Sequence, residues 1–168
     1  MFHEMRRKKQ ALNPDQCAVV LRRGTSGVLA LSDREDYPYA LPISYVFDGE
    51  KLYFHSAVTG HKLEVIRKNP KASFCVIDQD DIVPEKFTTY FRSVIAFGTI
   101  RILQEEEEKR LAIEKLAEKY SPKETAESRE KEIRSEWSRL CMLEMTIDHL
   151  TGKEAIELVR ASAARERK

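Results

Sequence analysis

The sequence predicts an α+β protein in which short helices surround an antiparallel β-barrel. Three observations carry this prediction. Short apolar segments with the alternation of strands recur along the chain, and Asp48-Gly49 between two of them is a strong signal for a two-residue hairpin. Helical segments bounded by capping and proline signals are interposed between these strands. No internal repeat or low-complexity linker interrupts the pattern, so about five to seven strands are expected to form one barrel.

The first predicted elements are a basic N-terminal arm at residues 1–12 and a helix over about 14–23. Asn13 is expected to cap the free amides of this helix, and Pro14 fits its first position. Gly24 is placed to end it after two arginines.

Three strands follow the first helix. Residues 27–32 and 39–47 are strand segments separated by a turn at 33–36, and Asp48-Gly49 leads into a third strand at 51–56. We expect these three strands to form an antiparallel meander.

The middle of the chain is expected to contain a helix, a strand, a loop and a further strand. The helix opens near Thr59, its expected cap, and Asn69-Pro70 ends it. Residues 72–77 are predicted as a strand, and the acidic, proline-containing segment 78–86 as a loop. Residues 88–103 form either a pair of strands or one bent strand.

Gly98 lies within the predicted strand segment 88–103 and is expected to mark a bulge there. Residues about 104–138 are rich in Glu, Lys and Arg and predict a charged helical insert that Ser121-Pro122 divides into two helices. The single tryptophan of the insert is an anchor against the barrel or a wall over a ligand. A last strand at 141–147 precedes a C-terminal helix at about 152–161 and a basic tail.

Composition and charge exclude several classes of protein. The 168 residues fit a single domain, residues 1–168, with 42% hydrophobic and 34% charged residues. A net charge of +1 provides no field that recruits nucleic acid or an anionic membrane. The three cysteines lie far apart, which suits a reducing cytoplasm better than a disulfide framework. We expect a cytoplasmic protein, because the N-terminus is not a signal peptide and no segment approaches the roughly 20 apolar residues that span a bilayer.

The strand–helix junction at residues 53–62 is the strongest candidate for binding chemistry. It places His55, Ser56 and Lys62 where free backbone amides and the positive end of a helix dipole attract an anion. A lysine in the first turn of a helix opposes the dipole unless an anion lies between them, which favours a phosphate site. The alternative is an ordinary surface lysine at a helix start.

Two other segments resemble ligand walls. Pro42 cannot donate to a central ladder, so residues 41–45 are expected at an edge, a bulge or an exposed groove. Residues 91–95 place an arginine and a serine beside apolar side chains. Ordinary sheet packing is the alternative for both segments.

Other chemistries find no support in the sequence. His55 and His61 are six residues apart across a strand–helix boundary, which matches no metal-ligand spacing, so no metal is expected. Glycine-rich dinucleotide loops, Walker loops and nucleophile elbows are absent. Cys75, between apolar strand residues, is interpreted as core filling.

The order of these segments resembles the pyridoxamine 5′-phosphate oxidase-like family of FMN-binding split barrels, and within it the Nim-type nitroimidazole-resistance proteins. The likeness covers nearly the whole chain, and no single segment is decisive. The matching segments are Gly27–Leu31, Tyr37–Tyr45, Leu52–Ala57, Gly60–Leu63, Asn69-Pro70, Arg92–Gly98 and Ile147–Ala155.

The resemblance implies a homodimer with two FMN sites at the subunit interface. Lys62 would hold the FMN phosphate, aided by Ser56 and Ala57, with His55 beside the ribityl chain or the ring. The isoalloxazine edge would be followed by Pro42, Ile43, Ser44 and Tyr45, and Arg92, Ser93 and Val94 would come from an opposite strand of the same or the partner subunit. His61 stands where members of the group often carry arginine, so charge compensation would rest on Lys62.

The function implied by the resemblance is that of an FMN-dependent oxidoreductase acting on nitroimidazoles or other small aromatic substrates. A reduced nicotinamide donor would dock transiently, and His55 is the candidate catalytic proton donor. Two alternatives stay open: a flavin-binding module for storage or redox sensing, and an interaction protein with an empty barrel.

Overall fold

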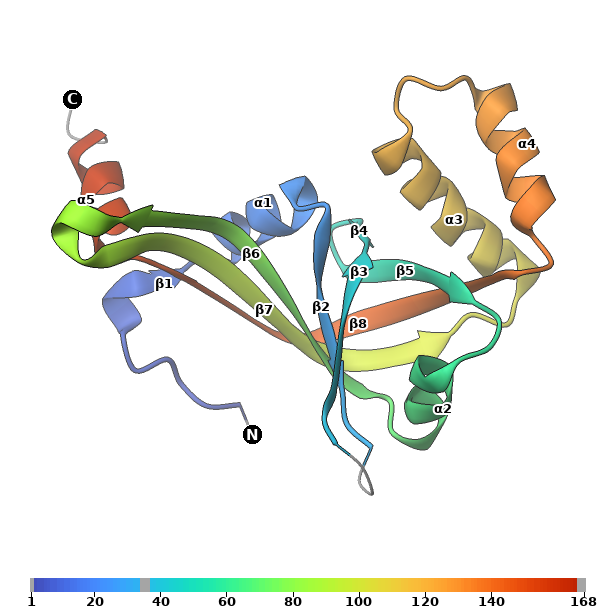
Figure 1. Ribbon diagram of the computed structural model, residues 1–168, viewed down its shortest axis with the longest axis horizontal. Helices are drawn as coiled ribbons and strands as arrows, with labels where there is room; N and C mark the ends of the chain where they lie inside the picture. Colours follow the sequence, from blue (N-terminus) through green and yellow to red (C-terminus); the bar gives the residue numbers. More distant parts are fainter. Residues whose placement is uncertain (1, 34–36, 166–168) are drawn as a thin grey trace.

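The computed structural model describes residues 2–33 and 37–165, and its centre is one antiparallel sheet that curls into a barrel (Figure 1). The strands are β1 Ala11–Leu12, β2 Ser26–Leu31, β3 Tyr39–Ser44, β4 Val46–Phe47, β5 Lys51–Ala57, β6 Lys71–Val83, β7 Thr88–Ile102 and β8 Leu140–Glu154. The helices are α1 Pro14–Arg23, α2 His61–Lys68, α3 Glu106–Tyr120, α4 Ala126–Glu136 and α5 Ile156–Arg165, with 3₁₀ turns at Lys8–Gln10 and Pro84–Lys86. The predicted α+β antiparallel split barrel is confirmed.

The order of the strands shows how the barrel closes. The path runs β3-β2-β6-β7-β8-β5-β4, and β1 pairs with β8 beside it. The two ends of this path, β3 and β4, are separated in the chain by Tyr45 alone. The sheet must therefore curl until its first and last strands meet, and the break at Tyr45 is where the barrel is split.

This break corrects two predictions. The expected strand at 39–47 is interrupted at Tyr45, and the expected meander of three adjacent strands is divided between the two ends of the path. β2 and β3 pair antiparallel, and β4 and β5 form a hairpin across Asp48, Gly49 and Glu50. The hairpin signal at Asp48 and Gly49 was correct, because it depends on a local turn, whereas the break depends on which distant strands pair. The predicted turn at 33–36 falls largely outside the described residues.

Helix α1 begins and ends where the sequence predicts. The Asn13 side chain accepts from the Gln16 amide at 2.9 Å, and the Gln16 side chain accepts from the Asn13 amide at 2.9 Å, a reciprocal capping box. Cys17, Val20 and Leu21 on its inner face are buried against the barrel.

The acidic segment 78–86 is not a loop. After a register shift at Asp78, β6 continues to Val83 paired with β7, with Asp80 opposite Phe91 and Ile82 opposite Thr89, and only Pro84–Lys86 form the turn. Because this part of the hairpin projects beyond the barrel, its polar side chains reflect exposure of a two-stranded arm rather than irregular backbone.

The C-terminal helix begins later than predicted. β8 extends to Glu154, and α5 starts at Ile156 rather than near 152. Gly152 pairs with both Val94 and Leu12, and a Cβ built on it would lie 2.5 Å from the Cys17 sulfur. The glycine therefore permits close packing of α1 on β8 and does not start a helix. The predicted tail lies partly in α5, and residues 166–168 are outside the described part.

A bulge is present at Gly98 as predicted, but its extra residue, Asp148, lies opposite on β8. The ladder between β7 and β8 slips between Phe97, which pairs with His149, and Gly98, which pairs with Ile147. A Cβ on Gly98 would lie 1.9 Å from the Thr146 carbonyl oxygen, so this close approach excludes any side chain. Residues 88–102 are thus one bent strand.

Two apolar clusters fill the molecule. The first lies inside the barrel, and the second lies between the sheet and α3, built from Val46, Tyr53, Leu103, Ala112, Leu116, Leu140 and Met142. Figure 1 shows the α3–α4 pair at one end of the long sheet and α5 with the β6–β7 turn at the other. Trp137 packs on the second cluster under the Lys109 ammonium, 4.0 Å from the ring centroid, and so serves as an anchor.

The predicted division of the charged insert into two helices is confirmed, with α4 capped by Thr125. Among the helices of the described residues, none has the length and apolar character that crossing a membrane requires.

Candidate functional site

The strand–helix junction predicted from the sequence is formed by the end of β5 and the start of α2. Gly60 is the N-cap, with φ 135°, and no side chain caps the helix, so the expected cap by Thr59 is wrong. A Cβ built on Gly60 would meet no atom within 4 Å. The first amides of α2 therefore open onto free space at the positive end of the helix dipole, which is the geometry of an anion site.

Lys62 lies in this first turn and is half-buried. It has no ion pair in the described part of the chain, whereas Lys68 at the other end of α2 pairs with Asp33 at 2.9 Å. Burial raises the pKa of the Cys141 thiol, and the charges of Lys109, Arg67 and Lys62 partly oppose this rise. Cys141 pairs with Ser56 across β8 and β5, which places Lys62 at the same end of the barrel as Ser56.

Ser56 carries an unsatisfied polar group. Its side chain is 6% exposed, and its hydroxyl is the one buried side-chain polar atom of the described residues that lacks a hydrogen-bond partner. Buried hydroxyls are almost always paired, so an orphan beside an open helix start indicates a partner from outside the chain.

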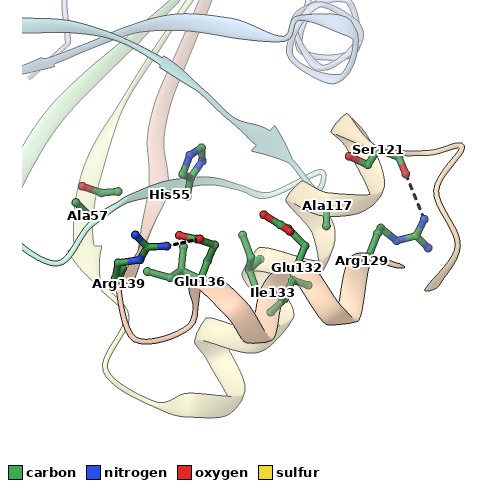
Figure 2. Close-up of a pocket in the computed structure, with 12 residues that line it drawn as sticks. His55, Ala57, Ala117, Ser121, Arg129, Glu132, Ile133, Glu136 and Arg139 are labelled. Carbon is green, nitrogen blue, oxygen red and sulfur yellow. Dashed lines mark hydrogen bonds and ion pairs between the residues drawn. The ribbon is translucent and has the colours of Figure 1, made fainter. Parts of the chain in front are cut away.

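A cavity of about 550 Å³ adjoins this junction, within the size range of small-molecule sites. It lies between β5, α3 and α4. Its lining is His55, Ser56, Ala57, Ile113, Ala117, Ser121, Arg129, Glu132, Ile133, Glu136, Arg139 and Leu140. Figure 2 shows His55 and Ala57 on β5, across the cavity from the side chains of α4.

The charged residues of α4 on this cavity, and Arg139 just after the helix, were not among the site residues predicted from the sequence. Arg139 pairs with Glu136 near Ala57, and Arg129 donates to the Ser121 carbonyl at 3.3 Å (Figure 2). The spacing of Arg129, Glu132 and Glu136 on one face of α4 was visible in the sequence. Which face turns toward β5 was not, because it depends on how α4 docks on α3.

The β3 edge has the exposure expected of a ligand wall. β3 pairs only with β2, so Pro42 lies on an edge strand and is exposed, as its missing amide requires. Ile43 and Ser44 are half-buried. Tyr45 differs, because its side chain is fully buried and its hydroxyl donates to the Leu21 carbonyl at 2.8 Å.

Helix α3 is fixed to the barrel at two places by lysines one turn apart. Lys119 donates to the carbonyls of Gly24 at 2.5 Å and Tyr45 at 3.0 Å, and burial lowers its pKa. Lys115 bonds Asp48 at 2.5 Å. Burial raises the pKa of Asp48, but the hydrogen bonds from Lys115 and from the backbone outweigh this effect and lower the pKa to about 2.

The β7 residues predicted for the site lie far from the junction. Ser93 pairs with Lys153 on β8, whereas His55 pairs with Met142, eleven positions away along the same strand. At about 3.3 Å per residue this is roughly 36 Å of strand. A single chain therefore does not bring the predicted β7 residues next to the residues of the strand–helix junction.

Arg92 and Val94 are also committed to other contacts. Arg92 bonds Glu154 at 2.8 Å and Asp78 at 3.3 Å, and Val94 is fully buried in the barrel core. Of the predicted site residues, the structure groups His55, Ser56, Ala57 and Lys62 at one end of the barrel.

Fold and site together define a split-barrel protein with an anion-receptive junction and an adjoining cavity. The chain belongs to the pyridoxamine 5′-phosphate oxidase family, whose model matches residues 13–154. An uncharacterised protein of Rhizobium meliloti is 33% identical over 69 residues, which are 41% of this chain and 44% of that protein. The chain thus matches less than half the length of this relative.

Solved structures show the same fold. A protein from Bacteroides thetaiotaomicron assigned to 5-nitroimidazole antibiotic resistance aligns with a TM-score of 0.71 and 19% identity over 86% of each chain. A FAD-binding protein from Mesorhizobium loti aligns with a TM-score of 0.61 and 21% identity, over 86% of this chain and 95% of that one.

Proposed function

We propose that this protein is an FMN-binding oxidoreductase that acts as a homodimer on nitroimidazole-like or other small aromatic substrates. The observation that carries the proposal is that two groups near the open start of α2 lack partners: the Lys62 ammonium has no ion pair among the described residues, and the buried Ser56 hydroxyl has no hydrogen bond. A doubly negative phosphate would satisfy both groups and the free amides. The flavin-binding neighbour and the resistance-protein neighbour support the same cofactor class and substrate class.

The bound flavin would supply the redox chemistry by accepting and passing on electrons. The residues of this chain would bind and orient it. Lys62 would compensate the phosphate charge, and the exposed β3 edge at Pro42, Ile43 and Ser44 would lie along the flat ring. The His55 imidazole, on the wall of the cavity, would hold a proton for a substrate docked there.

A second copy of the chain is proposed because the outer face of the sheet is apolar. Val28 and Ile77 are 40% and 67% exposed on this face, and Ile95 and Phe97 are half-exposed beside them. The outer face of a monomeric antiparallel barrel is normally polar. A twofold partner would cover it, and its β7 could bring Ser93 to the site that one chain leaves without it.

The location we propose is the cytoplasm. All three cysteines, Cys17, Cys75 and Cys141, are free thiols, as a reducing compartment requires.

The visible absorption spectrum of the purified protein, before and after addition of FMN, tests the cofactor. Flavin peaks are expected, and reduced nicotinamide should bleach them until a nitroimidazole restores them. Colourless protein that does not bind added FMN would refute the whole proposal. If the protein binds flavin but no donor bleaches it, the oxidoreductase activity would be refuted. A flavin-binding module for storage or redox sensing would then be the supported function.

A further inference from the structure

The break between β3 and β4 leaves buried backbone groups that the sheet does not satisfy. The last pair of β3 is Ser44 with Ser26, and the first pair of β4 is Val46 with Tyr53. Tyr45 between them is fully buried and belongs to neither ladder. Its amide and carbonyl therefore need partners from elsewhere.

Two residues at the end of α3 provide those partners. The Tyr120 hydroxyl accepts from the Tyr45 amide at 3.0 Å and lies 2.9 Å from the Tyr45 carbonyl oxygen, and it also bonds the Thr25 carbonyl. The Lys119 ammonium donates to the carbonyls of Tyr45 and Gly24. We call Lys119 and Tyr120 the α3 clamp.

The charge of Lys119 is compensated without a carboxylate. Its ammonium lies 4.2 Å from the centroid of the Tyr45 ring and at the C-terminus of α1, where Gly24 is the cap. Carbonyl oxygens at a helix C-terminus and the face of an aromatic ring both attract a cation. The ammonium is therefore held at this position by directed contacts rather than by a mobile surface ion pair.

The α3 clamp joins the two parts of the proposed flavin site. On one side, Tyr45 follows Ser44, the last residue of the exposed β3 edge. On the other side, α3 supplies Ile113 and Ala117 to the cavity wall, and Ser121 follows directly after the clamp. A change in the α3 clamp would therefore move the exposed β3 edge relative to the cavity wall that α3 forms.

We propose that Lys119 and Tyr120 are positioning residues of the flavin site, which fix the β3 edge against the α3 wall. This inference rests on the proposed function, because it assigns the clamp a role toward FMN. It requires no contact between the clamp and the flavin itself.

The test compares Lys119→Met and Tyr120→Phe with Lys115→Met as the matched control. Lys115→Met removes the same charge from the same helix one turn away, and loses the bond to Asp48 and the contact with the Tyr53 ring at 4.6 Å, but does not touch the break. All variants should fold, because each of them leaves the other attachment of α3 intact.

The expected result is an FMN dissociation constant raised about 5- to 50-fold by either clamp variant, within the usual range of coupling between sites. The visible circular dichroism of bound FMN should change as well. Lys115→Met should lower stability yet keep the dissociation constant within about twofold, and Lys119→Arg should restore part of the affinity. Clamp variants that bind FMN as the wild type does, or a control that weakens binding as much, would overturn the inference.

A second measurement needs no flavin. Hydrogen exchange of the Tyr45 amide should be faster in Tyr120→Phe than in the wild type, because the amide loses its acceptor. Unchanged exchange would also overturn the inference. Wild-type protein that binds no FMN would refute the proposed function instead, so the two failures are distinguishable.

Discussion

Replacing Lys62 by alanine should separate flavin affinity from protein stability, because the two are expected to change in opposite directions. Lys62 lies in the first turn of α2, where its charge opposes the helix dipole and no carboxylate compensates it. Without flavin, Lys62→Ala should therefore raise the free energy of unfolding by about 0.3–1 kcal/mol.

The effect on FMN should be larger and of the opposite sign. One charge-assisted hydrogen bond to a phosphate is worth about 1.5–3 kcal/mol. This corresponds to FMN binding roughly 10- to 100-fold more weakly. Because the side chain is only half-buried, the lower part of that range is expected at physiological salt.

Free FMN is fluorescent, so titration of a fixed FMN concentration with protein measures the dissociation constant, and urea unfolding of flavin-free protein measures stability. Lys68→Ala is the matched control, since it removes the same charge from the far end of the same helix, where Lys68 pairs with Asp33. FMN affinity should survive in the control. Equal FMN affinity for Lys62→Ala and the wild type would remove Lys62 from the site and refute the reasoning.

Three further predictions concern stability and assembly. Gly98→Ala should destabilise the fold by about 2–3 kcal/mol, measured by urea unfolding, because a Cβ there would lie 1.9 Å from the Thr146 oxygen; an unchanged midpoint would contradict the bulge geometry. Asp48, whose pKa falls from 3.8 to about 2, adds stability above pH 3.8 that is lost as pH falls through 2. Asp48→Asn should therefore lower the free energy of unfolding by about 1 kcal/mol at neutral pH and by less at acid pH. A difference in stability between variant and wild type that does not change with pH would exclude this linkage. Ile77→Lys should halve the mass in light scattering if the apolar face joins two copies; a mass identical to that of the wild type would argue against this interface.

Local signals predicted most of the secondary structure. The capping box at Asn13, the hairpin turn at Asp48 and Gly49, and the proline that follows α2 act over a few residues, and each element they bound is present. The bulge expected at Gly98 is also present, although its extra residue, Asp148, lies on the paired strand β8.

Two of the errors share one cause. The acidic hairpin arm at 78–83 and the end of β8 at 151–154 carry the composition of a loop and of a helix start, yet both are strands because partners distant in the sequence complete their ladders. Pairing energy from a neighbouring strand outweighs local preference, and composition does not record which neighbour will be present.

The sequence by itself determined the class of fold, the Asn13 cap and the turn at Asp48 and Gly49. It also determined the candidate anion site, because a strand end, an open helix start and a lysine are adjacent along the chain. Only the tertiary structure decided that Tyr45 splits the barrel, that α3 is clamped to that split, and that α4 completes a cavity over His55. These features depend on contacts between residues far apart in the chain, such as Tyr45 with Tyr120, which are 75 positions apart and which no local pattern specifies.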